Sequence, residues 1–294
     1  MNIKIKTFNK SVTTLQTLDF THWKFPAGEI GVKIQDIDSV WTGTVLFSIE
    51  WIINDKSNLS DELMIVCQLS SILKTEFPET EVEVYTPYLP YSRQDRACSK
   101  GEDFALKTFV SMLKSSGVDL LLTDDQHSNI DFDGFIYSTK QSQFVCKIKE
   151  DFDWFVAPDK GAFEKTKWNA IRVAEKEFLE ASNGSRAMLR LPTAFAMQKV
   201  RTPTGITYDD DTSRSDVLYG DVLITDDICD GGATFLQCAE AIRKKHPRVK
   251  TISLYVTHGI FSKGVDKLKE VFYSIYTANL MTSDEETNKF VKVI

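Results

Sequence analysis

Several features are missing from this sequence of 294 residues, and each absence excludes a class of protein. No apolar run approaches the roughly 18 residues that suggest a membrane-spanning helix. The amino-terminal stretch MNIKIKTFNKSVTTL lacks the apolar core of a signal peptide. The five cysteines are scattered and form no CxxC pair. These absences predict a cytoplasmic protein with reduced thiols and no membrane association.

A basic stripe is also missing. The formal net charge is -7, with 35 Lys and Arg against 42 Asp and Glu. This balance argues against nucleic-acid binding, which depends on a basic surface. An acidic protein that binds a polyphosphate needs Mg²⁺, backbone amides or a few well-placed cations to offset the electrostatic repulsion.

Strand-like and helix-like segments alternate along the chain. Residues 104–115 place apolar side chains at helical spacing, whereas 118–123 and 221–225 are short apolar runs typical of buried parallel strands. A second helical face follows 221–225, and residues 250–259 form another strand-like segment. The order strand, loop, helix, strand therefore occurs twice, which predicts an α/β protein of mainly parallel sheets flanked by helices.

The composition changes near residues 140–150, so we expect one domain over 1–145 and another over 146–294. Within the second, RTPTGITYDDDTSRSD (201–216) is polar, contains Pro, Gly and several Asp, and predicts a mobile loop.

A pair of cations stands where this polar loop begins. Lys199 and Arg201 are two residues apart, and in an extended segment such residues point the same way. On a mobile flap they can close over a transferring phosphoryl group and stabilise its charge. Taken alone the pair is weak evidence, because solvated Lys and Arg are common on surfaces.

The stretch DVLITDDICDGGATF (221–235) places three carboxylates against two glycines and a Thr. A metal loop, a helix cap with a turn and a sugar-phosphate site are the alternatives, but a cap needs only one carboxylate. Carboxylates can accept hydrogen bonds from ribose hydroxyls or hold Mg²⁺, and a glycine-rich helix start can cradle a phosphate. The predicted ribose-phosphate residues are Asp226, Asp227, Asp230, Gly231, Gly232, Ala233 and Thr234.

The segment YTPYLPYSRQDR (85–96) follows a strand and so lies at a carboxyl edge of a sheet. Arg93 and Arg96 can meet phosphates, while Gln94 and Asp95 can hydrogen-bond a base or orient those arginines. A solvated loop is the alternative.

Two further loops carry candidate metal ligands. In TDDQHS (123–128), His127 with a neighbouring Asp can form a mixed nitrogen and oxygen site for Mg²⁺ on a nucleotide, or bind a phosphate. In APDKGA (157–162), Asp159 is equally plausible as a second metal ligand or as a turn residue.

Together and in this order, the segments resemble the ribose-phosphate pyrophosphokinase family over about residues 25–265. FPAGE (25–29) resembles its Phe-x-x-x-Glu adenine segment, YSRQDR its Tyr-Ala-Arg-Gln-Asp ATP loop, and QKVR its Lys-x-Arg pair. TDDQHS stands where the family has Asp-Leu-His, and APDKGA where it has Pro-Asp-x-Gly-Gly. NLSDELMIVCQ (58–68) and VTHGIFSKG (256–264) resemble Asn-x-x-x-Met-Glu-Leu and Thr-His-Gly-Ile-Phe-Ser-Gly.

The resemblance implies two phosphoribosyltransferase-like domains, the first on the ATP side and the second on the ribose-phosphate side. It implies a Mg²⁺-dependent enzyme that transfers the diphosphate of ATP to the 1-hydroxyl of a ribose 5-phosphate compound, giving phosphoribosyl pyrophosphate and AMP. A homo-oligomer is implied as well. By this resemblance ATP contacts Phe25, Glu29, Arg93, Gln94, Asp95 and His127, with Phe25 and Glu29 reaching adenine across a subunit interface. His127 and Asp159 hold the metal, and Lys199 and Arg201 are catalytic.

Departures from the family pattern leave alternatives open. The phosphate loop usually reads Asp-Thr/Ser-x-Gly-Thr, whereas Gly231 follows Asp230 here, so a hydroxyl donor is lost and space is gained. A larger acceptor such as ADP-ribose, giving ADP-ribose pyrophosphate for NAD synthesis, is therefore an alternative. A phosphoribosyltransferase and a non-catalytic regulatory homologue are others. The sequence ends at KFVKVI, where the family usually continues with a further helix, which leaves the oligomer and its regulation open.

Overall fold

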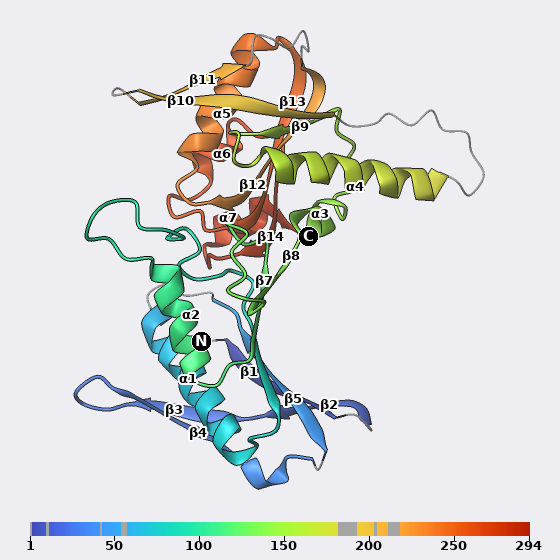
Figure 1. Ribbon diagram of the computed structural model, residues 1–294. Helices are drawn as coiled ribbons and strands as arrows, with labels where there is room; N and C mark the ends of the chain where they lie inside the picture. The colour runs from blue at the N-terminus through green and yellow to red at the C-terminus, as the bar shows by residue number, and fades with distance from the viewer. Residues whose placement is uncertain are drawn as a thin grey trace. The chain divides into compact units, whose positions relative to one another are not determined.

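A computed structural model describes residues 2–9, 12–41, 43–53, 58–181, 193–202, 205–210 and 218–294. For residues 12–14, 180–181, 199–202 and 205–210 it describes the backbone alone. The chain forms two compact units, Met1–Thr139 and Lys140–Ile294, each built around its own sheet (Figure 1).

The sheet of the first unit has the strand order β2-β1-β5-β6-β7-β8. The neighbours from β5 to β8 run parallel, and β1 pairs antiparallel with both β2 and β5. Short apolar runs form the parallel strands because both faces of such a sheet are covered. The strands are β1 (Ile3–Asn9), β2 (Val12–Leu18), β5 (Thr44–Trp51), β6 (Glu81–Tyr85), β7 (Leu120–Asp124) and β8 (Ile136–Thr139).

Two long helices, α1 (Leu59–Glu76) and α2 (Ala105–Ser115), lie in the first unit (Figure 1). The buried residues of α2 recur at helical spacing, as the sequence pattern predicts. A separate antiparallel ribbon, β3 (Phe20–Lys24) and β4 (Ile30–Ile34), is attached to α1: Gln68 Nε2 donates to the carbonyl of Ile30 at 2.8 Å. A short 3₁₀ helix, η1 (Ile37–Ser39), follows β4.

The sheet of the second unit has the order β11-β10-β9-β12-β13-β14-β15, and only the β10–β11 pair is antiparallel among the described strands. Its strands are β9 (Trp154–Ala157), β10 (Thr193–Thr202), β11 (Gly205–Asp210), β12 (Tyr219–Cys229), β13 (Arg248–Gly259), β14 (Ile275–Leu280) and β15 (Val291–Val293). The helices are α3 (Gln141–Val145), α4 (Phe163–Ala181), α5 (Ala233–Lys245), α6 (Asp266–Lys269) and α7 (Glu285–Phe290).

The prediction of an α/β protein with mainly parallel sheets flanked by helices is confirmed. Two local expectations need correction. The described part of 201–216 is not a simple loop, because Gly205–Asp210 forms β11, paired with β10. The strand expected over 221–225 continues to Cys229, because β13 pairs alongside as far as Cys229. None of the described helices has the length and apolar character that crossing a membrane would require.

Candidate functional site

The carboxyl end of β12 carries the first two predicted ribose-phosphate residues. Asp226 and Asp227 belong to the strand itself, in which Val222 to Ile224 pair with β9 and residues through Cys229 pair with β13. Both neighbouring strands are parallel to β12, so their carboxyl ends share this edge of the sheet. Ligands of open parallel sheets bind at such an edge.

The carboxylates of Asp226 and Asp227 repel one another. Desolvation, the negative charge of Asp227 and, less strongly, that of Asp159 raise the pKa of Asp226 well above its ordinary value. Burial, followed by the negative charges of Asp226 and Asp230, raises the pKa of the Cys229 thiol to about 12. The site therefore concentrates negative charge, and a bound cation or hydroxyl donors would reduce the repulsion among its carboxylates.

Asp159 lies on the loop that leaves the adjacent strand β9. Its Oδ1 accepts hydrogen bonds from the backbone amides of Gly161, at 2.9 Å, and Ala162, at 3.2 Å, where α4 begins. Asp159 thus acts as a turn residue, which is one of its two predicted roles. Its negative charge also helps to raise the pKa of Asp226. The first turn of α4 adds a cation that the sequence reasoning missed: Lys165 Nζ lies 3.9 Å from Oδ2 of the nearly buried Asp227.

A buried polar network supports this edge from beneath. Gln141 Nε2 donates to the carbonyl of Asp226 at 2.8 Å, and its Oε1 accepts from Asn169 Nδ2 at 2.6 Å. The hydroxyls of Thr166 and Thr225 lie 2.9 Å apart. Buried hydrogen bonds of this kind hold the backbone of Asp226 in place, although Oδ1 of Asn169 has no partner among the described residues.

The glycine-rich segment after β12 forms the amino-terminal end of α5. Gly232 is left-handed, with φ 77°, which suits a residue without a Cβ, and no side chain caps the helix. The amides of the first turn carry the positive end of the helix dipole, where anions are favoured. Ala233 and Thr234 begin α5, and Asp230 is exposed just before it.

The space beside Gly231 is not empty. A Cβ built on Gly231 would lie 3.2 Å from Cδ and 3.3 Å from Cε of Lys263, closer than an ordinary contact. Lys263 stands on the loop after β13, within the quoted VTHGIFSKG segment, and it was not predicted as a site residue. The sequence held one signal: Lys263 follows Ser262, where the family motif Thr-His-Gly-Ile-Phe-Ser-Gly has its last Gly.

In the first unit, the two candidate ATP loops leave adjacent parallel strands. The amide of Asp124 and the hydroxyl of Thr123 both donate to the carbonyl of Pro87 at 3.0 Å, which joins the loop after β6 to the end of β7. The hydroxyl of Tyr85 donates to Asp124 Oδ2 at 3.1 Å, and burial followed by the charge of Asp124 raises the pKa of Tyr85. These hydrogen bonds fix the carboxyl ends of β6 and β7, from which the two candidate ATP loops leave.

The predicted ATP residues of these loops differ in accessibility. Arg93, Gln94 and His127 are exposed. The Asp95 side chain is only 10% exposed and holds Arg96 through two hydrogen bonds, Nε to Oδ1 at 3.0 Å and Nη2 to Oδ2 at 3.3 Å. Asp95 therefore orients an arginine, which is one of its two predicted roles.

Phe25 and Glu29 lie elsewhere in the first unit, at the turn of the β3–β4 ribbon. The amide of Phe25 donates to the carbonyl of Glu29 at 2.8 Å, and the Phe25 ring is 48% exposed and packs edge-on against Trp23. Figure 1 shows this turn and the loop after β6 at different ends of the unit. The structure does not bring the two sets of predicted ATP residues together within one chain.

Two other predicted pairs are placed only in part. Lys199 and Arg201 lie on β10, opposite Tyr208 and Ile206 of β11, and their side chains are outside the described residues. His127 belongs to the first unit and Asp159 to the second, so a metal site shared by them remains a prediction. In the described part of the chain, no three His, Cys, Asp or Glu side chains are grouped as a ready-made metal site.

Comparison with known proteins finds relatives named ribose-phosphate pyrophosphokinase, and no family model matches the chain. It is 28% identical to the ribose-phosphate pyrophosphokinase of Pyrococcus abyssi over 268 residues, 89% of this chain and 84% of that protein. The Sulfurisphaera tokodaii enzyme of the same name is 24% identical over 85% of this chain and 79% of its own length.

A solved structure shares the fold. The phosphoribosylpyrophosphate synthetase of Mycobacterium smegmatis superposes with a TM-score of 0.73, covering 95% of this chain and 86% of the other at 19% identity. At that identity the likeness supports the fold alone. The sequence relatives thus confirm the similarity to ribose-phosphate pyrophosphokinases that the motifs indicate, over most of this chain.

Proposed function

We propose that the protein is a Mg²⁺-dependent diphosphokinase that moves the β,γ-diphosphate of ATP to the 1-hydroxyl of a ribose 5-phosphate compound, releasing AMP. One observation carries the proposal: the carboxylates at the end of β12 directly precede the glycine-rich start of α5. Hydrogen-bond acceptors for a sugar and backbone donors for a phosphate thus follow one another in the order that ribose 5-phosphate requires.

The carboxylates hold the ribose. Asp226 and Asp227 accept hydrogen bonds from its vicinal hydroxyls, and residues 230–234 bind the 5-phosphate. Such contacts also offset the desolvation and the repulsion that raise the pKa of Asp226. Positioning of this kind is the main task of the protein, because phosphoryl-type transfer needs little covalent help from side chains.

Carboxylate oxygens are ligands that suit Mg²⁺, so the chemistry of the second unit fits this ion. Asp159 and His127 are the proposed protein ligands. When bound, Mg²⁺ supplies charge neutralisation for the polyphosphate.

ATP is held on the side of the first unit by Arg93, Gln94, Asp95 and His127. Asp95 acts through Arg96, which it orients. Phe25 and Glu29 lie away from these residues in their own chain, so their contact with adenine requires a second copy of the protein. The proposal therefore includes a homo-oligomer in which the β3–β4 turn serves a neighbouring subunit.

Lys199 and Arg201 stabilise the charge on the transferring group. Their strand continues into the β10–β11 ribbon, which extends beyond the parallel part of the sheet (Figure 1). Cations on such a ribbon can reach a substrate bound at the neighbouring strand ends.

Two acceptors are compatible with this site. The simple acceptor is ribose 5-phosphate, which gives phosphoribosyl pyrophosphate. Gly231 favours a larger 5-phosphate ester such as ADP-ribose, because a substituted phosphate needs fewer fixed donors than a dianionic monoester does. Release of AMP from ATP and Mg²⁺, measured with each acceptor and without one, tests the proposal. Acceptor-dependent AMP is the expected result, whereas formation of ADP or no reaction with either acceptor would contradict it.

A further inference from the structure

We propose that Lys263 binds the 5-phosphate of the acceptor, supplying from a separate loop the donor that residue 231 lacks. The inference rests on the proposed function, because it assigns a residue to the same phosphate subsite. Gly231 has no side chain, and the methylene groups of Lys263 occupy the position beside it, with Cδ 3.2 Å from where a Cβ would be.

The backbone holds the Lys263 loop against the phosphate loop. The amides of Ile260 and Phe261 both donate to the carbonyl of Cys229, at 2.9 and 3.1 Å. The amide of Ser262 donates to the carbonyl of Asp230 at 3.2 Å. These three bonds fix the residues immediately before Lys263 against the residues immediately before Gly231.

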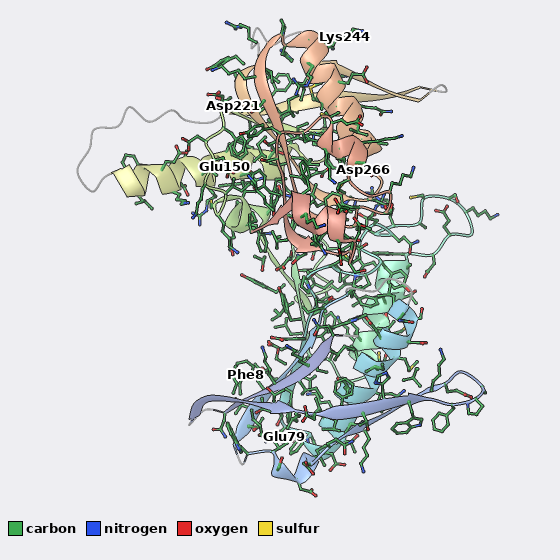
Figure 2. All side chains as sticks on the ribbon, turned by 180° about the vertical axis from the view of Figure 1, so that it is seen from behind. Phe8, Glu79, Glu150, Asp221, Lys244 and Asp266 are labelled. Carbon is green, nitrogen blue, oxygen red and sulfur yellow. The ribbon has the colours of Figure 1, made fainter. Side chains whose placement is uncertain are left out.

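Apolar packing fixes the same loop on both sides of Lys263. Phe261 and Val265 are buried in the core of the second unit, 3% and 2% exposed. Leu268 of α6 packs against Gly232, where a Cβ would lie 3.0 Å from its Cδ2. In Figure 2, Asp266 marks the start of α6, and Lys244 marks the opposite, carboxy-terminal end of α5. The backbone position of Lys263 is thus fixed by the packing of the residues on either side of it.

The charge of Lys263 is available to a ligand. The side chain is exposed, and among the described residues it has no ion pair or hydrogen bond. The surroundings are acidic, since Asp226, Asp227 and Asp230 lie on the adjoining segment. Lys165, the other cation noted at this edge, is near Asp227. Lys263 therefore carries a positive charge, unpaired among the described residues, next to the segment that leads into α5.

The same packing links residue 231 to residue 263 in our proposal. A hydroxyl-bearing side chain at 231 needs the volume that the Lys263 methylenes occupy. A flexible lysine can bind the phosphate of a monoester or move aside for a diester, whereas a hydroxyl fixed on the loop cannot. The shared chemistry is a 5-phosphate group, and both ribose 5-phosphate and ADP-ribose carry one.

The test compares Lys263→Met, which keeps the apolar arm and removes the charge, with Lys267→Met, an exposed lysine of α6, as the matched control. Binding of ribose 5-phosphate and of ADP-ribose is measured by calorimetry, and KM values come from AMP release. Lys263→Met should weaken binding of the preferred acceptor on the order of tenfold to a hundredfold, the range for a lost charged hydrogen bond, with little change in KM for ATP. Lys267→Met should resemble the original protein.

The outcomes separate this inference from the proposed function. Equal acceptor binding by Lys263→Met and the original protein would overturn the role of Lys263 while leaving the function intact. Weakened binding without any AMP release by the original protein would support Lys263 and overturn the function. Failure of the original protein to bind either acceptor would overturn both.

A second variant tests the link between the two positions. Gly231→Thr alone should weaken acceptor binding, because its Cβ meets the Lys263 arm. Gly231→Thr combined with Lys263→Ala restores a hydroxyl and clears its space, so it should bind better than either single variant. Additive losses in the double variant would contradict the proposed exchange of one donor for the other.

Discussion

The backbone amide of Asp227 donates a hydrogen bond to Oδ1 of Asp226 at 2.9 Å, which fixes the Asp226 carboxylate at the end of β12. Desolvation, followed by repulsion from Asp227, raises the pKa of Asp226, which means that the folded protein binds its proton more tightly than the unfolded chain does. The paired carboxylates therefore lower the stability of the ligand-free protein, and a ligand that offsets their charge would recover this free energy on binding.

We predict that Asp226→Asn stabilises the ligand-free protein at neutral pH by about 1–3 kcal/mol, because Asp226 is a partly buried carboxylate beside like charge. Below the pKa of an unfolded Asp, both states hold the proton and the carboxylate costs nothing. As the pH rises above that value, only the unfolded state ionises at first, so stability falls until the folded-state pKa is passed. The gain should therefore be absent at low pH and full above the folded-state pKa.

Denaturant unfolding at several pH values measures this gain. Asp221→Asn is the matched control, because Asp221 lies at the other end of β12 (Figure 2) and its Oδ1 accepts the Thr251 hydroxyl at 2.6 Å. The control should gain no stability. An Asp226→Asn protein that is less stable than the original at neutral pH would contradict the account of the pair.

Asp159 should have a structural role and a functional role that can be separated. Asp159→Ala removes the acceptor for the amides of Gly161 and Ala162, which should cost about 1 kcal/mol of unfolding free energy. Asp284→Ala, which removes a comparable cap from the Thr287 amide at the start of α7, should cost a similar amount. Only Asp159→Ala should raise the Mg²⁺ concentration needed for half-maximal AMP release. Equal Mg²⁺ dependence in both variants would leave Asp159 as a turn residue only.

Lys199→Ala should abolish AMP formation with little effect on folding, because the proposed role of Lys199 is to stabilise charge in the transition state. Lys289→Ala, which removes an exposed lysine paired with Glu286 on α7, is the control and should keep full activity. Circular dichroism establishes folding in both. Substantial AMP release by a folded Lys199→Ala protein would contradict the mechanism.

Local sequence patterns predicted much of the fold. The spacing of Leu106, Phe109, Val110 and Leu113 identified α2 because a helix buries one face, and all four are buried. The end of β12 was predicted too early because Asp226 and Asp227 are polar. The strand continues through them because pairing with β13 satisfies their backbone, which the sequence of one strand does not reveal.

The candidate site was predictable only where its residues are contiguous. The chain itself joins Asp226 to Gly231, so their proximity follows from the sequence. Lys263 and Lys165 reach the same edge from other segments, and only the folding of β13 and α4 places them there. The roles of the predicted site residues stay proposals, since a fold and a family do not establish a substrate.

The central claim is tested most directly with ATP that carries isotopic phosphorus at its β position. The measurement is which product contains the label. The protein, labelled ATP and Mg²⁺ are incubated with ribose 5-phosphate or with ADP-ribose, and the products are separated. Diphosphate transfer predicts that the label moves to the acceptor while unlabelled AMP is released in equal amount. Label that remains in ADP, or that appears only as free diphosphate, would contradict the proposed reaction.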